Sequence, residues 1–354
     1  MESKARMEGR SLKVPSVQEL LQKEKLRSVP SRYVRPDLTA PSDVPSSSQI
    51  PVIDMLNLLS DSMESELRKL HEACLEWGFF QLINHGVEAE AEKMKLEVRE
   101  FFNLPMEEKE KFRQQAGDLE GYGQVFVVSE EQKLDWGDMF FVTTFPTHLR
   151  KPHLIPNLPV PFRNEIDAYG AEMKILAMKI LGFMEKALGM ESGEMERVVF
   201  GEGMQTMRMN YYPPCPQPEL VTGISPHSDG AGLTILLQVN EIEGLQINKD
   251  GKWIPVSPLP NAFVVNIGDI LEIATNGAYR SVEHRVTVNS EKERLSIATF
   301  LNPAIDGYIG PAPSLVSLQT PAKFKTISSV EYLRGFFSKE LKGKSYVDVL
   351  RIPN

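Results

Sequence analysis

The second half of the chain is a series of short runs rich in β-branched and aromatic residues, separated by Gly, Pro and Asn. These runs begin at about residue 205 and include T-M-R-M-N-Y-Y, L-T-I-L-L-Q-V, L-Q-I-N, W-I-P-V and A-F-V-V-N-I. Runs of this length and composition, bounded by turn residues, are typical of β-strands. Many short strands at regular spacing predict a closed or sandwiched antiparallel β structure.

Three candidate metal ligands fall within this β-rich half. His227 and Asp229 stand two residues apart in S-P-H-S-D-G, so an extended backbone would direct both side chains to one face. His284, in R-S-V-E-H-R-V, follows after enough chain for several more strands. Two histidines and a carboxylate form a facial triad that leaves coordination positions open, as in non-haem Fe(II) enzymes. These ligands favour a jelly roll, and zinc or nickel could also occupy them in vitro.

A polar run, N-S-E-K-E, separates V-E-H-R-V-T-V from R-L-S-I-A-T-F, and we interpret it as a hairpin connection. An assumed pairing register places His284 on one face with alternate residues of the second strand, namely Arg294, Ser296, Ala298 and Phe300. Leu295 and Ile297 would then face the helices. Arg294 offers a planar, permanently charged fork that can grip the far end of a metal-chelating dicarboxylate, and Ser296 adds a hydroxyl donor.

These residues resemble a known family. H-S-D, His284 and R-L-S, preceded by M-N-Y-Y-P-P-C-P, are similar to the plant branch of the 2-oxoglutarate- and Fe(II)-dependent dioxygenases. The runs Q-T-M-R-M-N-Y-Y-P-P-C-P, G-L-T-I-L-L-Q and Y-R-S-V-E-H-R most resemble the morphinan alkaloid O-demethylases and the senescence-related dioxygenase-like group. The resemblance covers most of the chain, because P-V-I-D, E-W-G-F-F-Q-L-I-N-H-G-V and F-F-N-L-P match the helical amino-terminal half of the family.

The resemblance implies a role for each motif residue. His227, Asp229 and His284 would hold Fe(II). The co-substrate 2-oxoglutarate would be held by Arg294, Ser296, Asn210 and Tyr212. With O2 as second co-substrate and ascorbate as a supporting reductant, oxidative decarboxylation would yield succinate and CO2 while a plant specialised metabolite is hydroxylated, desaturated or O-demethylated. The protein itself would orient the reactants and exclude side reactions.

Substrate residues are predicted in two ways. The assumed strand face places Phe300 near the open end of the cavity, and Val125, Phe126, Phe140, Phe141 and Phe337 lie in segments that the family uses around its pocket. From the sequence alone, each of them fits an ordinary core position equally well. An apolar, aromatic lining suits a flat or polycyclic small molecule, such as an alkaloid, a phenolic or a terpenoid.

Composition narrows the class of protein. The net charge of −9 and the absence of a basic stripe argue against a nucleic-acid partner. The two cysteines, Cys74 and Cys215, predict no disulfide framework. No signal core or membrane-spanning run is seen, and we therefore expect a cytoplasmic monomer without a membrane partner.

The chain is expected to have four regions in an α+β fold. Residues 1–50 form an amino-terminal arm, and 51–200 a mostly helical region that packs on one sheet. Residues 201–310 form the jelly-roll core, with a double-stranded β-helix, and 311–354 a helical lid over its mouth.

Two alternatives remain open from the sequence alone. The first is an Fe(II) oxidase that does not use 2-oxoglutarate, as in the ethylene-forming oxidase of the same fold. The second is a non-catalytic small-molecule binder on the same barrel, although the complete triad argues against it.

Overall fold

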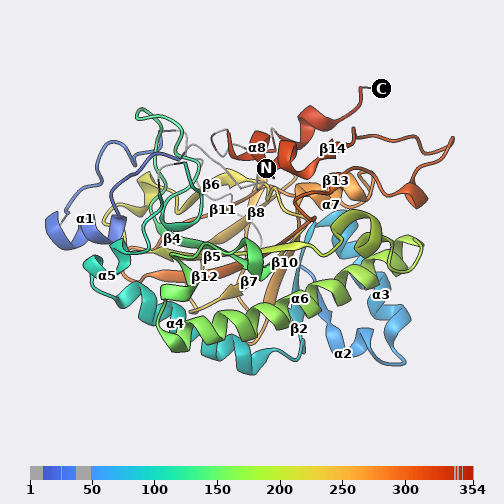
Figure 1. Ribbon diagram of the computed structural model, residues 1–354, viewed down its shortest axis with the longest axis horizontal. Coiled ribbons are helices and arrows are strands. Elements are labelled where there is room, and N and C mark those ends of the chain that lie inside the picture. Colours follow the sequence, from blue (N-terminus) through green and yellow to red (C-terminus); the bar gives the residue numbers. More distant parts are fainter. Residues whose placement is uncertain are drawn as a thin grey trace.

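Two facing β-sheets form the centre of the molecule (Figure 1). The computed structural model describes residues 11–24, 26–36, 49–115, 117–338, 340, 343–344 and 346–353. The larger sheet has eight strands, in the order β1 (Val52–Asp54), β2 (Phe79–Ile83), β10 (Phe263–Ile267), β7 (Leu233–Gln238), β12 (Arg294–Asn302), β5 (Met204–Tyr212), β4 (Asp138–Phe145) and β3 (Gly121–Gly123). The smaller sheet has four strands, in the order β6 (Ile224–His227), β11 (His284–Val286), β8 (Leu245–Lys249) and β9 (Lys252–Pro255). This is the predicted jelly roll.

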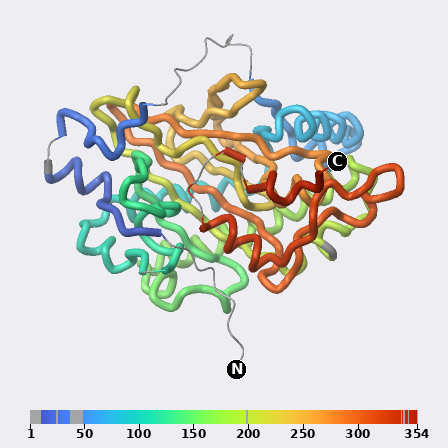
Figure 2. The backbone as a smooth tube through the Cα atoms, turned by 90° about the horizontal axis from the view of Figure 1, so that it is seen from above, coloured from blue at the N-terminus to red at the C-terminus, as the bar shows by residue number. Residues whose placement is uncertain are grey.

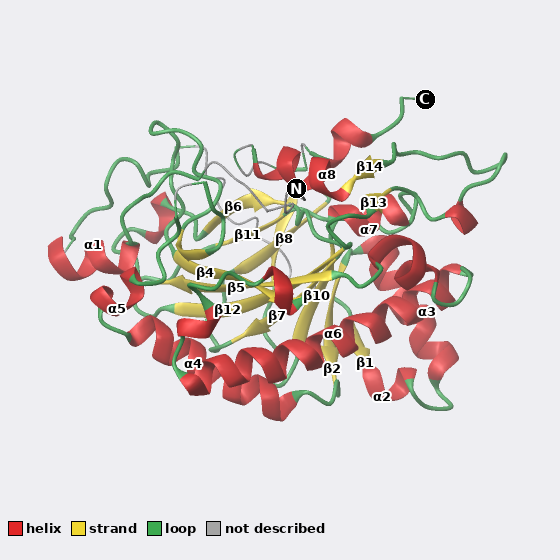
Figure 3. Cartoon of the chain, viewed as in Figure 1, coloured by secondary structure: helices red, strands yellow, loops and turns green. Residues whose placement is uncertain are grey.

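A layer of helices covers the outer face of the larger sheet (Figure 3). It consists of α2 (Met55–Leu58), α3 (Met63–Glu76), α4 (Glu88–Asn103) and α6 (Val160–Leu188). The longest, α6, buries Ile166, Met173 and Ile180, which recur at helical spacing, and it ends at Gly189, whose φ of +69° is the left-handed conformation that glycine adopts easily. The predicted α+β class and the helical layer on one sheet are confirmed.

The remaining elements are short. They are α1 (Val17–Glu24), α5 (Met106–Glu110), α7 (Asp269–Ala274), α8 (Ser329–Phe337), the two-stranded sheet of β13 (Tyr308–Ile309) and β14 (Ile327–Ser328), and the turns η1 (Thr147–Leu149), η2 (Ile155–Asn157), η3 (Met195–Phe200), η4 (Pro218–Leu220), η5 (Pro313–Leu315) and η6 (Val347–Leu350). Helix α8 and the carboxyl-terminal segment, red in Figures 1 and 2, lie on the opposite side of the sheets from α4 and α6. None of the helices in the described ranges combines the length and the apolar character that crossing a bilayer requires.

Alternating side chains give the larger sheet two different faces. On β12, Leu295 and Ile297 belong to the core shared with the helices, as predicted. The intervening residues, Arg294 and Ser296, face the space between the sheets. Because successive side chains of a strand point to opposite faces, one strand can serve a dry core and a polar interior at once.

The predicted hairpin between β11 and β12 is wrong. Strand β11 pairs with β6 and β8, whereas β12 pairs with β5 and β7 in the other sheet. The N-S-E-K-E run therefore crosses from one sheet to the other. His284 and Arg294 still line one cavity, but they face it from opposite walls and not from adjacent strands.

Strands β1 to β4 come from the region predicted to be mostly helical, so the predicted regions 51–200 and 201–310 share one sheet. Within the predicted arm, the described residues pack on the core. Val14, Val17 and Tyr33 are buried in a cluster with Trp136, whose ring lies 5.3 Å from that of Tyr33.

Asp138, at the start of β4, anchors the arm. Its carboxylate accepts hydrogen bonds from the Ser16 hydroxyl at 2.8 Å and from the backbone N–H groups of Val17 and Gln18, both at 2.9 Å. These donors surround the beginning of α1, where backbone N–H groups lack partners within the helix. The carboxylate thus ties the arm to the larger sheet.

We expect Asp138→Ala to lower the free energy of unfolding by about 1–3 kcal/mol, because buried donors would lose their acceptor. Urea unfolding would measure the loss, and limited proteolysis should show earlier cleavage within residues 11–36. Asp167→Ala is the control, since that carboxylate pairs with Arg150 at a half-exposed site and its loss should cost less than about 1 kcal/mol. Equal losses in the two variants would contradict the anchoring role.

Candidate active site

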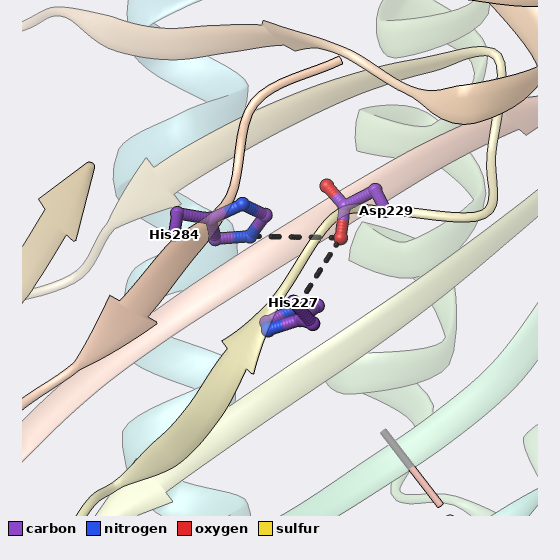
Figure 4. Close-up of side chains that lie close together, drawn as sticks. All are labelled: His227, Asp229 and His284. Atoms are coloured by element: carbon purple, nitrogen blue, oxygen red, sulfur yellow. Dashed lines mark ion pairs between the residues drawn. The ribbon is translucent and has the colours of Figure 1, made fainter. Parts of the chain in front are cut away.

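The three predicted metal ligands converge between the two sheets (Figure 4). Strands β6 and β11 pair so that His227 and His284 are directly opposite each other. Asp229 lies two residues beyond the end of β6 and not within an extended strand. Its Oδ1 is 3.5 Å from Nε2 of His227 and 3.6 Å from Nε2 of His284, and the three ligand atoms lie within 4.8 Å of one another. All three side chains are buried.

Hydrogen bonds orient both imidazoles toward the shared centre. Nδ1 of His227 lies 2.8 Å from the carbonyl oxygen of Ser225, and Nδ1 of His284 lies 3.2 Å from that of Val282. A carbonyl can only accept, so each Nδ1 carries the proton and each Nε2 keeps its lone pair. Burial and the nearby His227 lower the pKa of His284 to about 4. The neutral imidazole that a metal needs is therefore favoured.

Asp229 is held as an ionised, oriented ligand. Burial would raise the pKa of this carboxyl group, but the imidazoles of His284 and His227 and the Asn266 amide outweigh burial and hold it well below its usual range. Oδ2 accepts hydrogen bonds from the Thr234 hydroxyl at 2.7 Å and from the Asn266 amide at 2.8 Å. These bonds leave Oδ1 directed toward the two imidazoles, so the donor set fits a metal with three protein ligands and open positions.

The carboxyl-terminal segment supports the strand that carries His227. Gly343 donates its N–H to the carbonyl of Pro226 at 2.9 Å and accepts from the N–H of Ser228 at 3.3 Å. Next to it, Lys344 donates to the buried carboxylate of Glu272 at 2.7 Å. The segment predicted as a lid therefore holds the backbone on both sides of His227.

A second polar group lies deeper in the same cavity. Arg294 is opposite Tyr212 and Ser296 is opposite Asn210 on the paired strands β12 and β5. Nη1 of Arg294 donates to the Ser296 hydroxyl at 3.4 Å, and the guanidinium lies over the Tyr212 ring at 5.5 Å. Arg294 Nη2 also donates to Gln238 at 3.1 Å. All four predicted co-substrate residues line one cavity with the triad.

Arg294 lacks a counter-charge. The guanidinium is 1% exposed, and within the described ranges it forms no ion pair with a carboxylate. Its Nε and Oδ1 of Asn210 are buried without hydrogen-bond partners among the described residues. An unpaired buried cation is costly, so the site fits an anionic ligand such as the distal carboxylate of 2-oxoglutarate.

A larger, mostly apolar cavity opens beside the triad, with a volume of about 630 Å³ that includes its open mouth. Five of the six predicted substrate residues line it together with His227 and Asp229, namely Val125, Phe126, Phe141, Phe300 and Phe337. Phe126, which has an uncommon φ of +65°, stacks on Phe337 of the predicted lid helix at 5.3 Å between ring centroids.

Phe140 does not belong to this lining. Its ring is fully buried and stacks on Phe101 at 4.6 Å, in the core between the larger sheet and α4. Because β4 alternates its faces, Phe141 points to the cavity and Phe140 must point to the helices.

Sequence reasoning missed several residues around the site. They are Thr234 and Asn266 behind Asp229, and Met204, Thr206, Arg208, Leu333 and Phe336 in the apolar cavity. The signal for Thr206 and Arg208 was present, since they share the alternating face of Asn210 and Tyr212 on β5. Thr234 and Asn266 carry no comparable signal. Asn266 is remote from Asp229 in the sequence, and Thr234, five residues from Asp229, meets it only through the turn between β6 and β7.

Comparisons with known proteins agree with this geometry. Residues 203–303 match the 2OG-Fe(II) oxygenase superfamily, and residues 50–158 match the amino-terminal region of non-haem dioxygenases in morphine synthesis. The chain is 66% identical to oxoglutarate-dependent flavonoid 7-O-demethylase 1 of Ocimum basilicum, over 98% of this chain and 93% of that protein. The chain belongs to the 2-oxoglutarate- and Fe(II)-dependent oxygenases.

Other members of the family are similar over nearly the whole chain. Thebaine 6-O-demethylase of Papaver somniferum is 53% identical, over 97% of this chain and 98% of that protein. A crystal structure of JOX2 in complex with 2OG, Fe and JA has a TM-score of 0.87 at 38% identity, and the match covers 96% of this chain and 98% of that one. The protein is therefore a 2-oxoglutarate-dependent dioxygenase that uses Fe(II) and O2, and the two alternatives left open by the sequence are set aside.

We expect Thr234→Val to weaken Fe(II) binding by roughly 10- to 100-fold, because Asp229 would lose a hydrogen bond that orients it. Anaerobic titration with Fe(II), or with Co(II) as a spectroscopic substitute, would measure the dissociation constant. Thr299→Val is a matched control, since Thr299 is buried on the other face of the same sheet. An unchanged affinity in the Thr234 variant would contradict this role.

Proposed function

We propose that this dioxygenase removes the methyl group from a methoxy oxygen of a flat phenolic molecule, with a 7-methoxylated flavone as the favoured substrate. The observation that carries the proposal is the 66% identity to a flavonoid 7-O-demethylase, combined with a cavity in which aromatic side chains surround two of the candidate metal ligands. Phe300, Phe141 and the stacked pair Phe126 and Phe337 offer ring surfaces suited to a planar aromatic guest.

In this proposal His227, Asp229 and His284 would be the protein ligands of Fe(II). When it is bound, the iron would supply the chemistry that oxidises the methyl C–H bond. Arg294 and Ser296 would hold the distal carboxylate of 2-oxoglutarate, with Tyr212 and Asn210 beside them. Because this group and the triad line one cavity, the keto acid end of a co-substrate held there would face the triad.

The overall reaction balances without a protein acid or base. One 2-oxoglutarate and one O2 give succinate, CO2 and one oxygen atom, which is inserted into a methyl C–H bond. The resulting hemiacetal breaks its bond between the former methyl carbon and the phenolic oxygen, and it releases formaldehyde and the free phenol. The task of the chain is to place the methoxy group beside the triad and to keep water out of the aromatic cavity.

Two finer properties stay predictions, namely that the protein is a monomer and that it is cytoplasmic. The second is consistent with buried, unpaired thiols at Cys74 and Cys215.

We expect the iron-loaded protein to convert 7-methoxyflavone to 7-hydroxyflavone with equal amounts of formaldehyde and succinate. Mass spectrometry of the flavone, with assays of both small products in the presence of ascorbate, would test this. His227→Ala should abolish all three products. Succinate accompanied by a hydroxylated flavone that keeps its methyl group would show that the reaction is hydroxylation and would overturn the demethylase assignment.

Arg294→Met should weaken 2-oxoglutarate binding by roughly 10- to 100-fold, because a hydrogen-bonded charge pair is lost. The ligand-free variant should be at least as stable as the wild type, since a buried unpaired cation is replaced by an apolar side chain. Anaerobic calorimetry and the rise in Tm on adding 2-oxoglutarate give the two readouts. A variant that keeps both the affinity and the Tm shift would contradict the assignment.

A further inference from the structure

Arg208, on β5, lines three cavities of the interior. It lines the deep cavity with Arg294, the apolar cavity with Phe300, and a small polar side cavity with Asp135. Among the described residues, it is the only cationic side chain that lines the apolar cavity. A charged group so placed is either neutralised by a neighbouring acid or available to a ligand.

Among the described residues, no acid neutralises it. Arg208 forms no ion pair there, and its Nε is buried without a hydrogen-bond partner. Two acids line the side cavity with Arg208, namely Asp135 and Glu340. Asp135 is already engaged by Arg35 at 2.9 Å and by the Ser225 hydroxyl at 2.6 Å, and Glu340 is exposed to solvent. The guanidinium therefore has donor capacity that the described protein leaves unused.

The β5–β12 ladder places this donor between co-substrate and substrate. Facing the interior, the pair Arg294 and Tyr212 is followed by Ser296 and Asn210, and then by Ala298 and Arg208. Two steps of two residues correspond to roughly 13 Å along the strands. The donor is thus well removed from the residues proposed to hold the distal carboxylate, and it lies at the level where the apolar cavity begins.

The neighbours of Arg208 leave room for a planar guest. On one side it pairs with Ala298, whose methyl group takes little space, and on the other side it pairs with Phe141, which lines the apolar cavity. A flat molecule could lie against Phe141 and Phe300 and present an oxygen atom at its edge to the guanidinium.

The net charge of the loaded site also favours an acceptor oxygen as the partner of Arg208. The charges of Fe(II), dianionic 2-oxoglutarate, Asp229 and Arg294 sum to zero. Asp135 is paired with Arg35 and Glu340 is exposed to solvent, so the charge of Arg208 is left over in the loaded site. A further electron-rich oxygen is the ligand that this excess favours.

We infer that Arg208 is a specificity-determining residue that donates hydrogen bonds to an acceptor oxygen on the ring system of the substrate. For a flavone, which the proposed function supplies, the acceptor is the ring carbonyl. The aromatic walls would then hold any flat molecule, whereas Arg208 selects those that carry an acceptor and sets which methoxy group reaches the triad.

The test compares two flat probes, 7-methoxyflavone and 7-methoxy-2-phenylnaphthalene, which keeps the flat aromatic framework and lacks the ring carbonyl. Anaerobic calorimetry on the Fe(II)- and 2-oxoglutarate-loaded enzyme measures binding without turnover. Wild type should bind the flavone roughly 10- to 100-fold more tightly than the naphthalene. Arg208→Met should abolish this preference by weakening the binding of the flavone alone, and Arg208→Lys should keep part of the preference. Arg163→Met, in the outer helical layer, is the matched control and should keep the full preference.

The outcomes of this experiment distinguish an error in the role of Arg208 from an error in the proposed function. If wild type binds neither probe, the flavone substrate itself is wrong. If the flavone binds and Arg208→Met keeps the preference, the specificity role is overturned. If Arg208→Met instead weakens 2-oxoglutarate binding, Arg208 belongs to the co-substrate site and the inference is equally overturned. An unchanged Tm and an unchanged 2-oxoglutarate affinity would show that the variant is intact.

Discussion

The pairing of β5 with β12 is the constraint on which the rest of the interior depends. Nine residue pairs hold these two strands together, and the side chains alternate strictly along both. One face delivers Leu295, Ile297 and Met209 to the core beneath the helices. The other face delivers Arg294, Ser296 and Asn210 to the cavity. A slip of one residue would exchange the two sets and would destroy the core and the proposed co-substrate site together.

The same alternation explains how the interior tolerates buried charge. Arg294 is buried and has the Tyr212 ring against its guanidinium, and no carboxylate among the described residues forms an ion pair with it. Asp229, by contrast, is compensated by donors from Thr234 and Asn266. In the ligand-free site, the carboxylate of Asp229 therefore has its hydrogen-bond donors, whereas the guanidinium of Arg294 lacks a counter-charge. Such an arrangement favours binding of an anion at one end and a metal at the other.

Much of this site could be predicted from the sequence, because its key residues obey local rules. The alternation from Arg294 to Phe300 is visible in the letters alone, and so is the closeness of His227 and Asp229, although Asp229 lies beyond the end of β6 and not in the extended strand that was expected. The predicted hairpin was wrong because a polar link of this length can connect two strands of one sheet or lead the chain to the facing sheet. The prediction for Phe140 was wrong because adjacent residues on a strand point to opposite faces, and only the register decides which of the two aromatic side chains lines the cavity. The Asn266 contact depends on tertiary structure, and the Thr234 contact depends on the turn that leads from Asp229 into β7, which no sequence motif specifies.

The carboxyl-terminal segment contacts both the apolar cavity and the backbone around the candidate ligand His227. Phe337 of α8 lines the cavity, while Gly343 forms hydrogen bonds with Pro226 and Ser228, on either side of His227. Glu272, which is fully buried, forms ion pairs with Lys344 and Arg351 of this segment. Because a buried carboxylate is stabilised by such pairing, Glu272 fixes the position of the residues next to Gly343. The segment therefore contributes to the shape of the cavity and to the placement of His227 at once.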